Sequence, residues 1–206
     1  MFLRPTRAHK VQELLVCNGV QLIIISLDSK RARLAFDIPL NFVNKLLRTD
    51  ENLYYVALSS KEEAIYFHST HPSRSSTLLR CKQLLGAANR PRCKVIVICE
   101  RTLLESEVLG LSLKFVRYDQ NPFKTVKHLK LPFTGTAVEF SESASYLAIL
   151  NFKEVTIISL SAGKPLKRII LFEIPTCLDF LPNDGHIVIG DKAGDLFIVE
   201  LKRERS

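Results

Sequence analysis

The stretch TCLDFLPNDGHIVIGDKAGDLFIVEL, residues Thr176 to Leu201, decides the fold of this chain. Short apolar runs alternate in it with clusters of turn-forming residues, which is the pattern of strands joined by tight connections. Three strands are predicted, namely Thr176–Phe180, His186–Gly190 and Leu196–Leu201. We therefore expect this segment to fold as a three-stranded meander.

The two turns of this meander contain the residues that tight turns require. In Pro182–Gly185 the glycine is expected to take a positive φ, because it lacks a Cβ. In Asp191–Asp195 the side chain of Asp191 is expected to accept hydrogen bonds from backbone N–H groups of its own turn. In the last strand, the side chains expected to face a core are those of Leu196, Ile198 and Val199.

The preceding segment repeats this pattern. Thr136–Phe140 matches Thr176–Phe180 at an offset of 40 residues, Tyr146–Ile149 matches His186–Ile189 at 40, and Glu154–Leu160 matches Asp195–Leu201 at 41. A period of about 40 residues with four strands per unit is typical of WD-repeat β-propellers. We predict an all-β, WD-repeat-type propeller, partial, with about five blades' worth of strands. Two clean blades are expected in 131–206 and irregular N-terminal blades in 1–130.

The composition is that of a soluble globular protein. The chain has 206 residues, of which 47% are hydrophobic, and this is enough to bury a core. Neither a signal peptide nor an apolar run of about 18 residues is found, so an intracellular protein is expected. The five cysteines form no C-x-x-C pair and lie mostly among apolar residues, which favours reduced, inert thiols.

Positive charge is concentrated in the first part of the chain. Residues 1–130 hold 21 Lys and Arg against 11 Asp and Glu, whereas residues 131–206 hold 8 against 10. The net charge of +8 is compatible with a nucleic-acid partner, although charge alone shows only that the field attracts one.

The N-terminal part contains further hairpin signals. Asn18-Gly19 between two apolar runs is a strong signal for a hairpin, because both turn residues need positive φ. Leu14 and Tyr54 are again 40 residues apart, which extends the period toward the N-terminus. The expected strands are 11–17, 20–27, Arg33–Ile38, Leu53–Leu58 and Ala64–Phe67, the last two joined by the turn Ser59–Glu63.

Residues 68–93 break the pattern and are expected to form a long basic loop between strands. No acidic residue lies between Glu63 and Glu100. Two interpretations stay open, a solvated loop or an edge of the propeller that contacts phosphates. The candidate contact residues are Arg74, Arg80, Lys82, Arg90, Arg92 and Lys94.

Strands are expected to resume after this loop. They are Lys94–Cys99, Leu111–Tyr118 and the outer strand Thr125–Leu131, with a helical turn or long loop at Arg101–Gly110 and a turn at Asn121-Pro122. A basic cluster surrounds the outer strand, namely Lys124, Lys127, His128 and Lys130. We interpret these lysines as charges that keep an exposed sheet edge from pairing, rather than as a binding site.

No constellation typical of catalysis is found. His68-x-x-His71 can place two imidazoles on one metal, but the nearest cysteines, Cys81 and Cys93, are not paired in a way that completes a zinc site. Phosphate-binding loops, nucleophile elbows and H-E-x-x-H motifs are absent. We interpret Asp179, Asp184, Asp191 and Asp195 as turn and strand-end carboxylates, and His186 as a strand residue. A non-enzyme without catalytic, cofactor or metal residues is expected.

Two motifs in the clean blades resemble those of a known family. They are Phe140-Ser-Glu-Ser-Ala-Ser-Tyr146 and Gly190-Asp-Lys-Ala-Gly-Asp-Leu196. A Phe-Ser-x-Ser-x-Ser-Tyr segment followed by a DK-x-GD turn is similar to the WD-repeat non-catalytic subunit of the tRNA (guanine-N7-)-methyltransferase. The family-motif turn consists of Asp191, Lys192, Gly194 and Asp195. The resemblance covers about a third of the chain, and the family continues with further blades, so it points to a truncated or divergent member.

The resemblance implies a scaffold. In that family the partner is a catalytic subunit that binds S-adenosylmethionine and methylates N7 of a guanosine in the tRNA variable loop. The propeller subunit stabilises this partner as a heterodimer and helps hold the tRNA. The resemblance further implies a nuclear location and no cofactor on this chain. From the residues themselves we expect no membrane contact, and the six basic residues are the candidates for tRNA contact.

Two other interpretations remain open. The chain is alternatively a WD-repeat scaffold for protein–protein interactions in another complex, because its final blades are near neutral and carry no strong RNA motif. An enzyme in its own right is the third interpretation, and nothing in the residues favours it.

Overall fold

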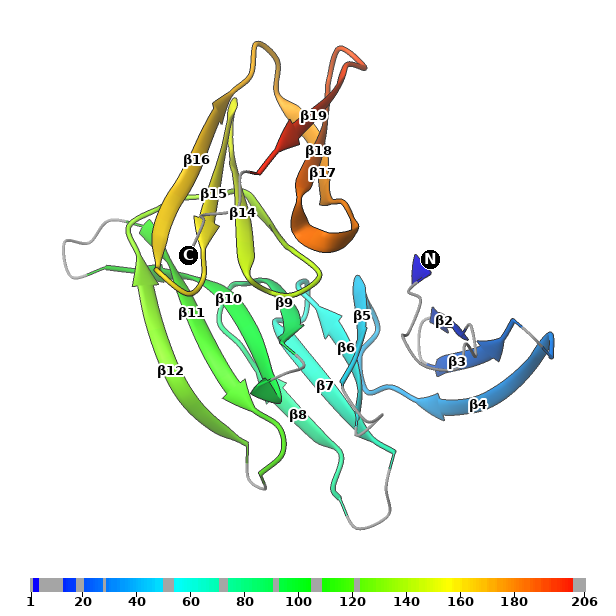
Figure 1. The fold of residues 1–206 in the computed structure, drawn as a ribbon. Coiled ribbons are helices and arrows are strands. Elements are labelled where there is room, and N and C mark those ends of the chain that lie inside the picture. Colours follow the sequence, from blue (N-terminus) through cyan, green and yellow to red (C-terminus); the bar gives the residue numbers. More distant parts are fainter. Residues whose placement is uncertain are drawn as a thin grey trace. The chain divides into compact units, whose positions relative to one another are not determined.

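The computed structural model describes residues 2–3, 13–17, 21–27, 29–49, 54–70, 74–90, 93–104, 109–120 and 123–201. The chain divides into two compact units, Met1–Cys81 and Lys82–Ser206, and each is described by itself. The division lies between the second and third sheets, whereas the composition suggested a change at residue 130. The five sheets follow one another along the chain, from blue to red in Figure 1.

The first unit contains two four-stranded antiparallel sheets of consecutive strands. Blade 1 comprises β1 (Phe2–Leu3), β2 (Glu13–Cys17), β3 (Gln21–Ser26) and β4 (Arg31–Asp37), and blade 2 comprises β5 (Lys45–Arg48), β6 (Tyr54–Ser59), β7 (Ala64–Ser69) and β8 (Thr77–Arg80). Leu14 and Tyr54 both lie in the second strand of their sheets, so the 40-residue period extends to blade 1. Their shared core includes Leu22 and Ile24 of β3 and Tyr55 of β6.

The second unit contains three sheets. Blade 3 comprises β9 (Leu84–Arg90), β10 (Val95–Leu103), β11 (Leu109–Arg117) and β12 (Lys124–Leu131). Blade 4 comprises β13 (Ala137–Phe140), β14 (Tyr146–Asn151), β15 (Glu154–Ser159) and β16 (Lys164–Ile170), and blade 5 comprises β17 (Pro175–Phe180), β18 (His186–Asp191) and β19 (Leu196–Glu200). Neighbouring strands are antiparallel and hydrogen-bonded in chain order, so each blade is a meander.

Two apolar cores lie between the blades of the second unit. Ile149 and Ile158 of blade 4 belong to a core shared with blade 3, whereas Val155 and Ile157 belong to a core shared with blade 5. Successive side chains of a strand point to opposite faces of the sheet. The apolar run in β15 is therefore buried on both faces, as a strand inside a stack of blades must be.

The expected all-β, WD-repeat-type propeller fold with about five blades' worth of strands is confirmed. The matched segments become equivalent strands, since β13, β14 and β15 pair in the same way as β17, β18 and β19. The hairpin around Asn18-Gly19 is present as β2 and β3. The turn residues themselves, like Asn121-Pro122, lie outside the described residues.

The prediction of a long basic loop at 68–93 was wrong. β7 continues to Ser69, and the segment then forms β8 and β9. Gly86, Ala87 and Ala88 belong to the segment predicted as a loop, but a Cβ added at Gly86 would lie 3.3 Å from a side-chain carbon of Val138 in β13. Small residues are needed here because two inner strands approach closely, so the first half is less irregular than its composition suggests.

Residues 101–110 also differ from the prediction of a helical turn or long loop. β10 extends to Leu103 and β11 begins at Leu109. The two strands pair over nine positions, ending with Leu103 opposite Leu109. Both leucines are exposed there, at 65% and 52%. Strand pairing continues past the buried core, which a search for apolar periodicity does not detect.

Two details of the last blade were predicted incorrectly. Asp184 takes the positive φ of 56° in the first turn, and Gly185 has a φ of −83°. Aspartate tolerates the left-handed region better than most residues. In β19, Leu196 and Ile198 are exposed, whereas Phe197 and Val199 pack on the core shared with blade 4. The prediction that a side chain of β19 faces the core is therefore confirmed for Val199 and wrong for Leu196 and Ile198.

Candidate functional site

The family-motif turn joins β18 to β19, and two of its residues build it. The carboxylate of Asp191 accepts hydrogen bonds from the backbone N–H groups of Ala193, at 3.0 Å, and Asp195, at 2.9 Å. Gly194 has a φ of +91°, where a side chain would be strained. The expected capping role of Asp191 is therefore confirmed. The side chains of Lys192 and Asp195 are exposed and available for contact.

The serine-rich motif forms the turn between β13 and β14 of blade 4, and one of its side chains contacts blade 5. Ser141 is almost fully buried, and its hydroxyl accepts hydrogen bonds from the backbone N–H groups of Ser145 and Tyr146. Ser143 donates a hydrogen bond to the carboxylate of Asp184 in the next blade. Both motifs thus have structural roles, and the exposed surfaces beside them are the places to search for function.

An exposed apolar surface lies at the end of blade 4, beside the family-motif turn. Its members are Phe152, in the β14–β15 turn, Ile170, at the end of β16, and Phe172, in the connection to β17. Their exposed fractions are 66%, 81% and 92%. We call these three residues the apolar end surface. Large apolar side chains this exposed, on segments joined by hydrogen bonds, mark candidate interaction sites in soluble proteins.

Backbone hydrogen bonds hold this surface in place. The N–H of Leu171 donates to the carbonyl of Lys153 at 2.9 Å, and the ammonium of Lys153 donates to the carbonyl of Phe172. The N–H of Lys192 donates to the carbonyl of Ile174 at 3.0 Å. The family-motif turn and the segment carrying Phe172 are therefore joined directly.

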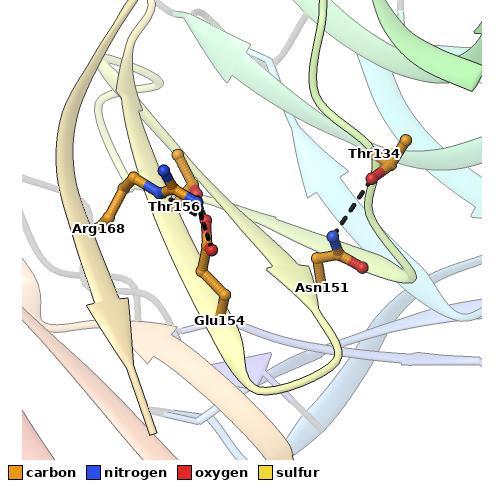
Figure 2. Close-up of polar contacts among 5 residues, drawn as sticks. All are labelled: Thr134, Asn151, Glu154, Thr156 and Arg168. Carbon is orange, nitrogen blue, oxygen red and sulfur yellow. Dashed lines mark hydrogen bonds and ion pairs between the residues drawn. The ribbon is translucent and has the colours of Figure 1, made fainter.

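A polar network lies on the strands next to the apolar end surface (Figure 2). Arg168 of β16 binds both carboxylate oxygens of Glu154, at 2.8 and 2.6 Å, and Thr156 donates to the same carboxylate at 2.7 Å. The hydrogen bond from Arg168, followed by that from Thr156, lowers the pKa of Glu154 below its ordinary value. Arg168 and Glu154 offset each other's charges, so this pair adds no net charge beside Ile170.

Asn151 makes the second contact in Figure 2. Its side-chain amide donates to the hydroxyl of Thr134 at 3.2 Å. Thr134 lies in the connection between β12 and β13, and Asn151 ends β14 immediately before Phe152. The start of the turn that presents Phe152 is thus held by side-chain as well as backbone contacts.

Sequence reasoning missed the apolar end surface. The signal was present as the apolar run Ile169 to Phe172, which is longer than its strand needs, and as Phe152 in a two-residue turn. Phe152 has a φ of +52°, a conformation that large side chains rarely adopt.

The six basic candidates do not form one cluster in either unit. Arg80 ends β8, whereas Arg74 lies in the connection that precedes it. Lys82 precedes β9 and Arg90 ends it, so a seven-residue strand, about 20 Å long, separates them. Lys94 follows in the next turn, and Arg92 lies outside the described residues. Their role in tRNA contact stays a prediction.

The spacing of His68 and His71 is compatible with two imidazoles on one metal. His68 stacks on Phe36 with ring centroids 3.5 Å apart, and burial lowers its pKa. His71 lies outside the described residues. Within the described part of the chain, no group of three His, Cys, Asp or Glu side chains is placed to hold a metal. His68 therefore has a packing role.

A serine–histidine contact joins β11 to β12 in blade 3. The Ser112 hydroxyl lies 2.5 Å from Nε2 of His128, and Glu100 lies opposite Ser112 on the neighbouring strand. Glu100 binds the ammonium of Lys114 at 2.6 Å rather than the imidazole.

Burial, followed by the charge of Glu100, raises the pKa of Cys99 to about 12, so this thiol is inert at neutral pH.

Comparisons with known proteins show the fold. No family model and no curated protein sequence matches the chain. Among solved structures, the β-propeller domain of Myceliophteria thermophila Cps50 (Swd1) superposes with a TM-score of 0.71 at 11% identity, over 99% of this chain and 65% of that one.

Two further structures are similar. Kluyvelomyces marxianus Hsv2 has a TM-score of 0.53 at 8% identity, over 94% of this chain and 70% of its own. Kuenenia stuttgartiensis hydrazine synthase has a TM-score of 0.62 at 10% identity, over 89% and 66%. The chain thus spans about two thirds of these proteins. Since 852 solved chains match, the shared fold does not select a function.

No helix among the described residues is long and apolar enough to cross a membrane.

Proposed function

We propose that this chain is a non-catalytic propeller scaffold that binds a partner protein through its apolar end surface. The observation that carries the proposal is the exposure of Phe152, Ile170 and Phe172 on connections held by backbone hydrogen bonds. Aromatic side chains on a rigid backbone lose little conformational entropy on binding and dominate the energy of protein interfaces. A solvated polar turn would not need three large apolar residues.

The partner that we propose is the catalytic subunit of a tRNA (guanine-N7-)-methyltransferase, in a nuclear heterodimer that also holds tRNA. The support is the resemblance of the Asp191–Asp195 turn, which lies next to the apolar end surface through the Lys192–Ile174 hydrogen bond. S-adenosylmethionine binds the partner subunit, and this chain supplies no cofactor site. Its exposed Lys192 and Asp195 are placed to pair with charges of the partner.

The test is co-purification of this chain with the methyltransferase subunit after co-expression. Phe172→Ala together with Phe152→Ala should weaken the complex at least tenfold, because each aromatic anchor is worth about 1 kcal/mol or more. Phe42→Ala is the matched control, since Phe42 is also an exposed phenylalanine, at 52%, and lies in the first unit.

Three outcomes are informative. If the double variant binds the methyltransferase as well as the unchanged chain does, the apolar end surface is not the interface. If no methyltransferase is recovered but another purified protein binds through Phe152 and Phe172, the scaffold proposal stands and the partner is wrong. A shift to dimers in light scattering that the double variant abolishes identifies a second copy of the chain as the occupant instead.

A further inference from the structure

The outer strands of blades 3 and 4 carry the same lysine pair. Lys124-Thr-Val-Lys127 in β12 and Lys164-Pro-Leu-Lys167 in β16 are separated by 40 residues, the period of the fold. All four lysine side chains are exposed. The lysine pair therefore recurs at equivalent positions of the two outer strands, with the same residue type.

A β-bulge turns both lysines of each pair to one side of the sheet. Lys127 lies opposite Phe115 and Thr125 lies opposite Val116, so Val126 is an extra residue. In a regular strand, residues three positions apart point to opposite faces, and the extra residue cancels this alternation. Lys127 accordingly lies over the ring of Phe115, with its ammonium 5.4 Å from the centroid, on the side that faces blade 4.

The same β-bulge occurs in blade 4. Lys167 lies opposite Ile157 and Pro165 lies opposite Ile158, so Leu166 is the extra residue. The ammonium of Lys167 donates to the backbone carbonyl of Glu200 in blade 5, at 3.0 Å. Each lysine pair thus faces the blade that follows it.

The outer strands that carry the two pairs are in contact. A Cβ added at Gly163, in the turn before Lys164, would lie 3.2 Å from a side-chain carbon of Leu129. The start of β16 therefore packs against the C-terminal half of β12, and both strands are labelled in Figure 1. Neither strand contains an acidic residue.

The near-neutral composition of residues 131–206 gives no indication of this basic surface. Glu142, Glu173, Asp184 and Asp195 of this half lie in turns and connections, and the other described acidic residues lie on inner strands or on β19, whereas Lys164 and Lys167 lie on the outer strand β16. Glu154 on the neighbouring strand is paired with Arg168, and β16 itself carries no acidic residue beside Lys164 and Lys167. The field over the outer strands is positive, and such a field attracts anions.

Protection of a sheet edge does not account for this arrangement by itself. A bulge or a single charge is enough to keep an edge strand from pairing. The outer strands of the first unit carry no lysine, since β4 has Arg31 and Arg33 and β8 has Arg80. Two lysine pairs with the same spacing, the same bulge and the same direction exceed that need.

We propose that Lys124, Lys127, Lys164 and Lys167 form a lysine ladder that binds the phosphate backbone of RNA. Lysine ammonium groups act on phosphates as point charges and read no base sequence. A repeated spacing on successive blades suits a polymer with a repeated charge. The inference rests on the proposed function in one respect, that tRNA is a partner, and it assigns the contact to the outer strands.

The experiment measures binding of an unmodified tRNA transcript to the full chain between about 50 and 200 mM salt. The variant K124Q/K127Q/K164Q/K167Q should bind about tenfold or more weakly, and the salt slope should fall by about 3 to 4, near one for each phosphate contact. The variant with four Lys→Arg changes keeps the charge and should retain binding. Circular dichroism of each variant reports whether the fold is kept.

A second charge-matched variant, R74Q/R80Q/K82Q/R90Q, separates this inference from the earlier basic candidates. A smaller loss in this variant than in the lysine-ladder variant supports the ladder. The reverse order overturns the ladder and leaves tRNA binding by the proposed subunit intact. If the unchanged chain, alone and with the methyltransferase subunit, binds no tRNA but binds phosphatidylserine vesicles through the ladder, both the RNA assignment and the tRNA part of the proposed function fail.

Discussion

Blades 4 and 5 have the same repeat but different surroundings. Val155 and Ile157 of β15 are fully buried, at 0% exposed, whereas Leu196 and Ile198, 41 residues later in β19, are 66% and 62% exposed. The third strand of blade 4 is covered by β16 and by blade 5, and β19 is the edge of its sheet among the described residues. Burial in this fold is therefore set by the neighbouring blade, since the two strands have similar apolar patterns.

The largest expected difference between the two blades is in the free energy of unfolding. Ile157→Ala removes buried methyl groups from the core between blades 4 and 5 and should cost about 2–5 kcal/mol. Ile198→Ala at the matching position should change stability by less than about 0.5 kcal/mol, because the side chain is already exposed. Urea unfolding of both variants measures the difference.

Equal losses for Ile157→Ala and Ile198→Ala would contradict the comparison. They would show that the far side of β19 is covered in solution, and that the difference between the blades is not real.

The next effect concerns the residue that ends the second strand in each blade, Asp191 in blade 5 and Asn151 in blade 4. Asp191→Ala should cost about 1–3 kcal/mol, because two backbone N–H groups of the turn lose a buried acceptor. Asn151→Ala should cost less than about 0.5 kcal/mol, since its one hydrogen bond is exposed. Thermal unfolding of both variants checks this order, and a larger loss for Asn151→Ala would refute it.

A smaller effect is expected from the glycine and phenylalanine at positive φ in the corresponding turns. Gly194→Ala should destabilise by about 1 kcal/mol through backbone strain alone, because no atom lies within 4 Å of the added Cβ. Phe152→Gly should leave stability unchanged or raise it by up to about 1 kcal/mol, since the side chain is mostly exposed. Its binding to the partner should nevertheless weaken. A stability loss in Phe152→Gly would show that Phe152 packs within the chain.

The smallest effect concerns the Glu154–Arg168 pair, which blade 5 does not reproduce because Arg168 lies on a fourth strand. Arg168 lowers the pKa of Glu154, so the carboxylate stabilises the fold above its ordinary pKa of 4.5 and this contribution is lost as the pH falls through that value and below. The stability difference between the unchanged chain and Glu154→Gln should therefore be small and constant near pH 7, and should disappear in acid. High salt should reduce it as well. A difference that grows in acid would mean that the pKa of Glu154 is raised.

The sequence predicted the fold well where the repeat is regular. The offsets between 136–160 and 176–201 identified equivalent strands, because apolar alternation and turn residues recur together there. It predicted poorly where packing between elements decides the structure. Gly86, Ala87 and Ala88 were included in the predicted loop because the close approach of β13 is not visible in a linear sequence. Leu196 was predicted to face the core because the sequence does not show which face of β19 a neighbouring blade covers.

The candidate site was less predictable than the fold. Asp191 could be assigned to its turn because capping is a local interaction within five residues. The apolar end surface depends on hydrogen bonds between the segments that carry Phe152 and Phe172, which are 20 residues apart in the chain. The lysine ladder depends on two bulges, and a bulge reverses the side on which a residue is expected without leaving a clear mark in the sequence. Sites of this kind become visible only with the register of the strands.

The exposed edge of β19 has a consequence for handling the protein. The outer strands β12 and β16 carry lysines, which repel an approaching strand of another molecule, whereas β19 reads Leu-Phe-Ile-Val-Glu and has one charge. At high concentration the backbones of two such strands can pair edge to edge, and the exposed side chains of Leu196 and Ile198 add an apolar face beside the pair. Self-association of the chain is therefore expected to begin at β19 rather than at β12 or β16.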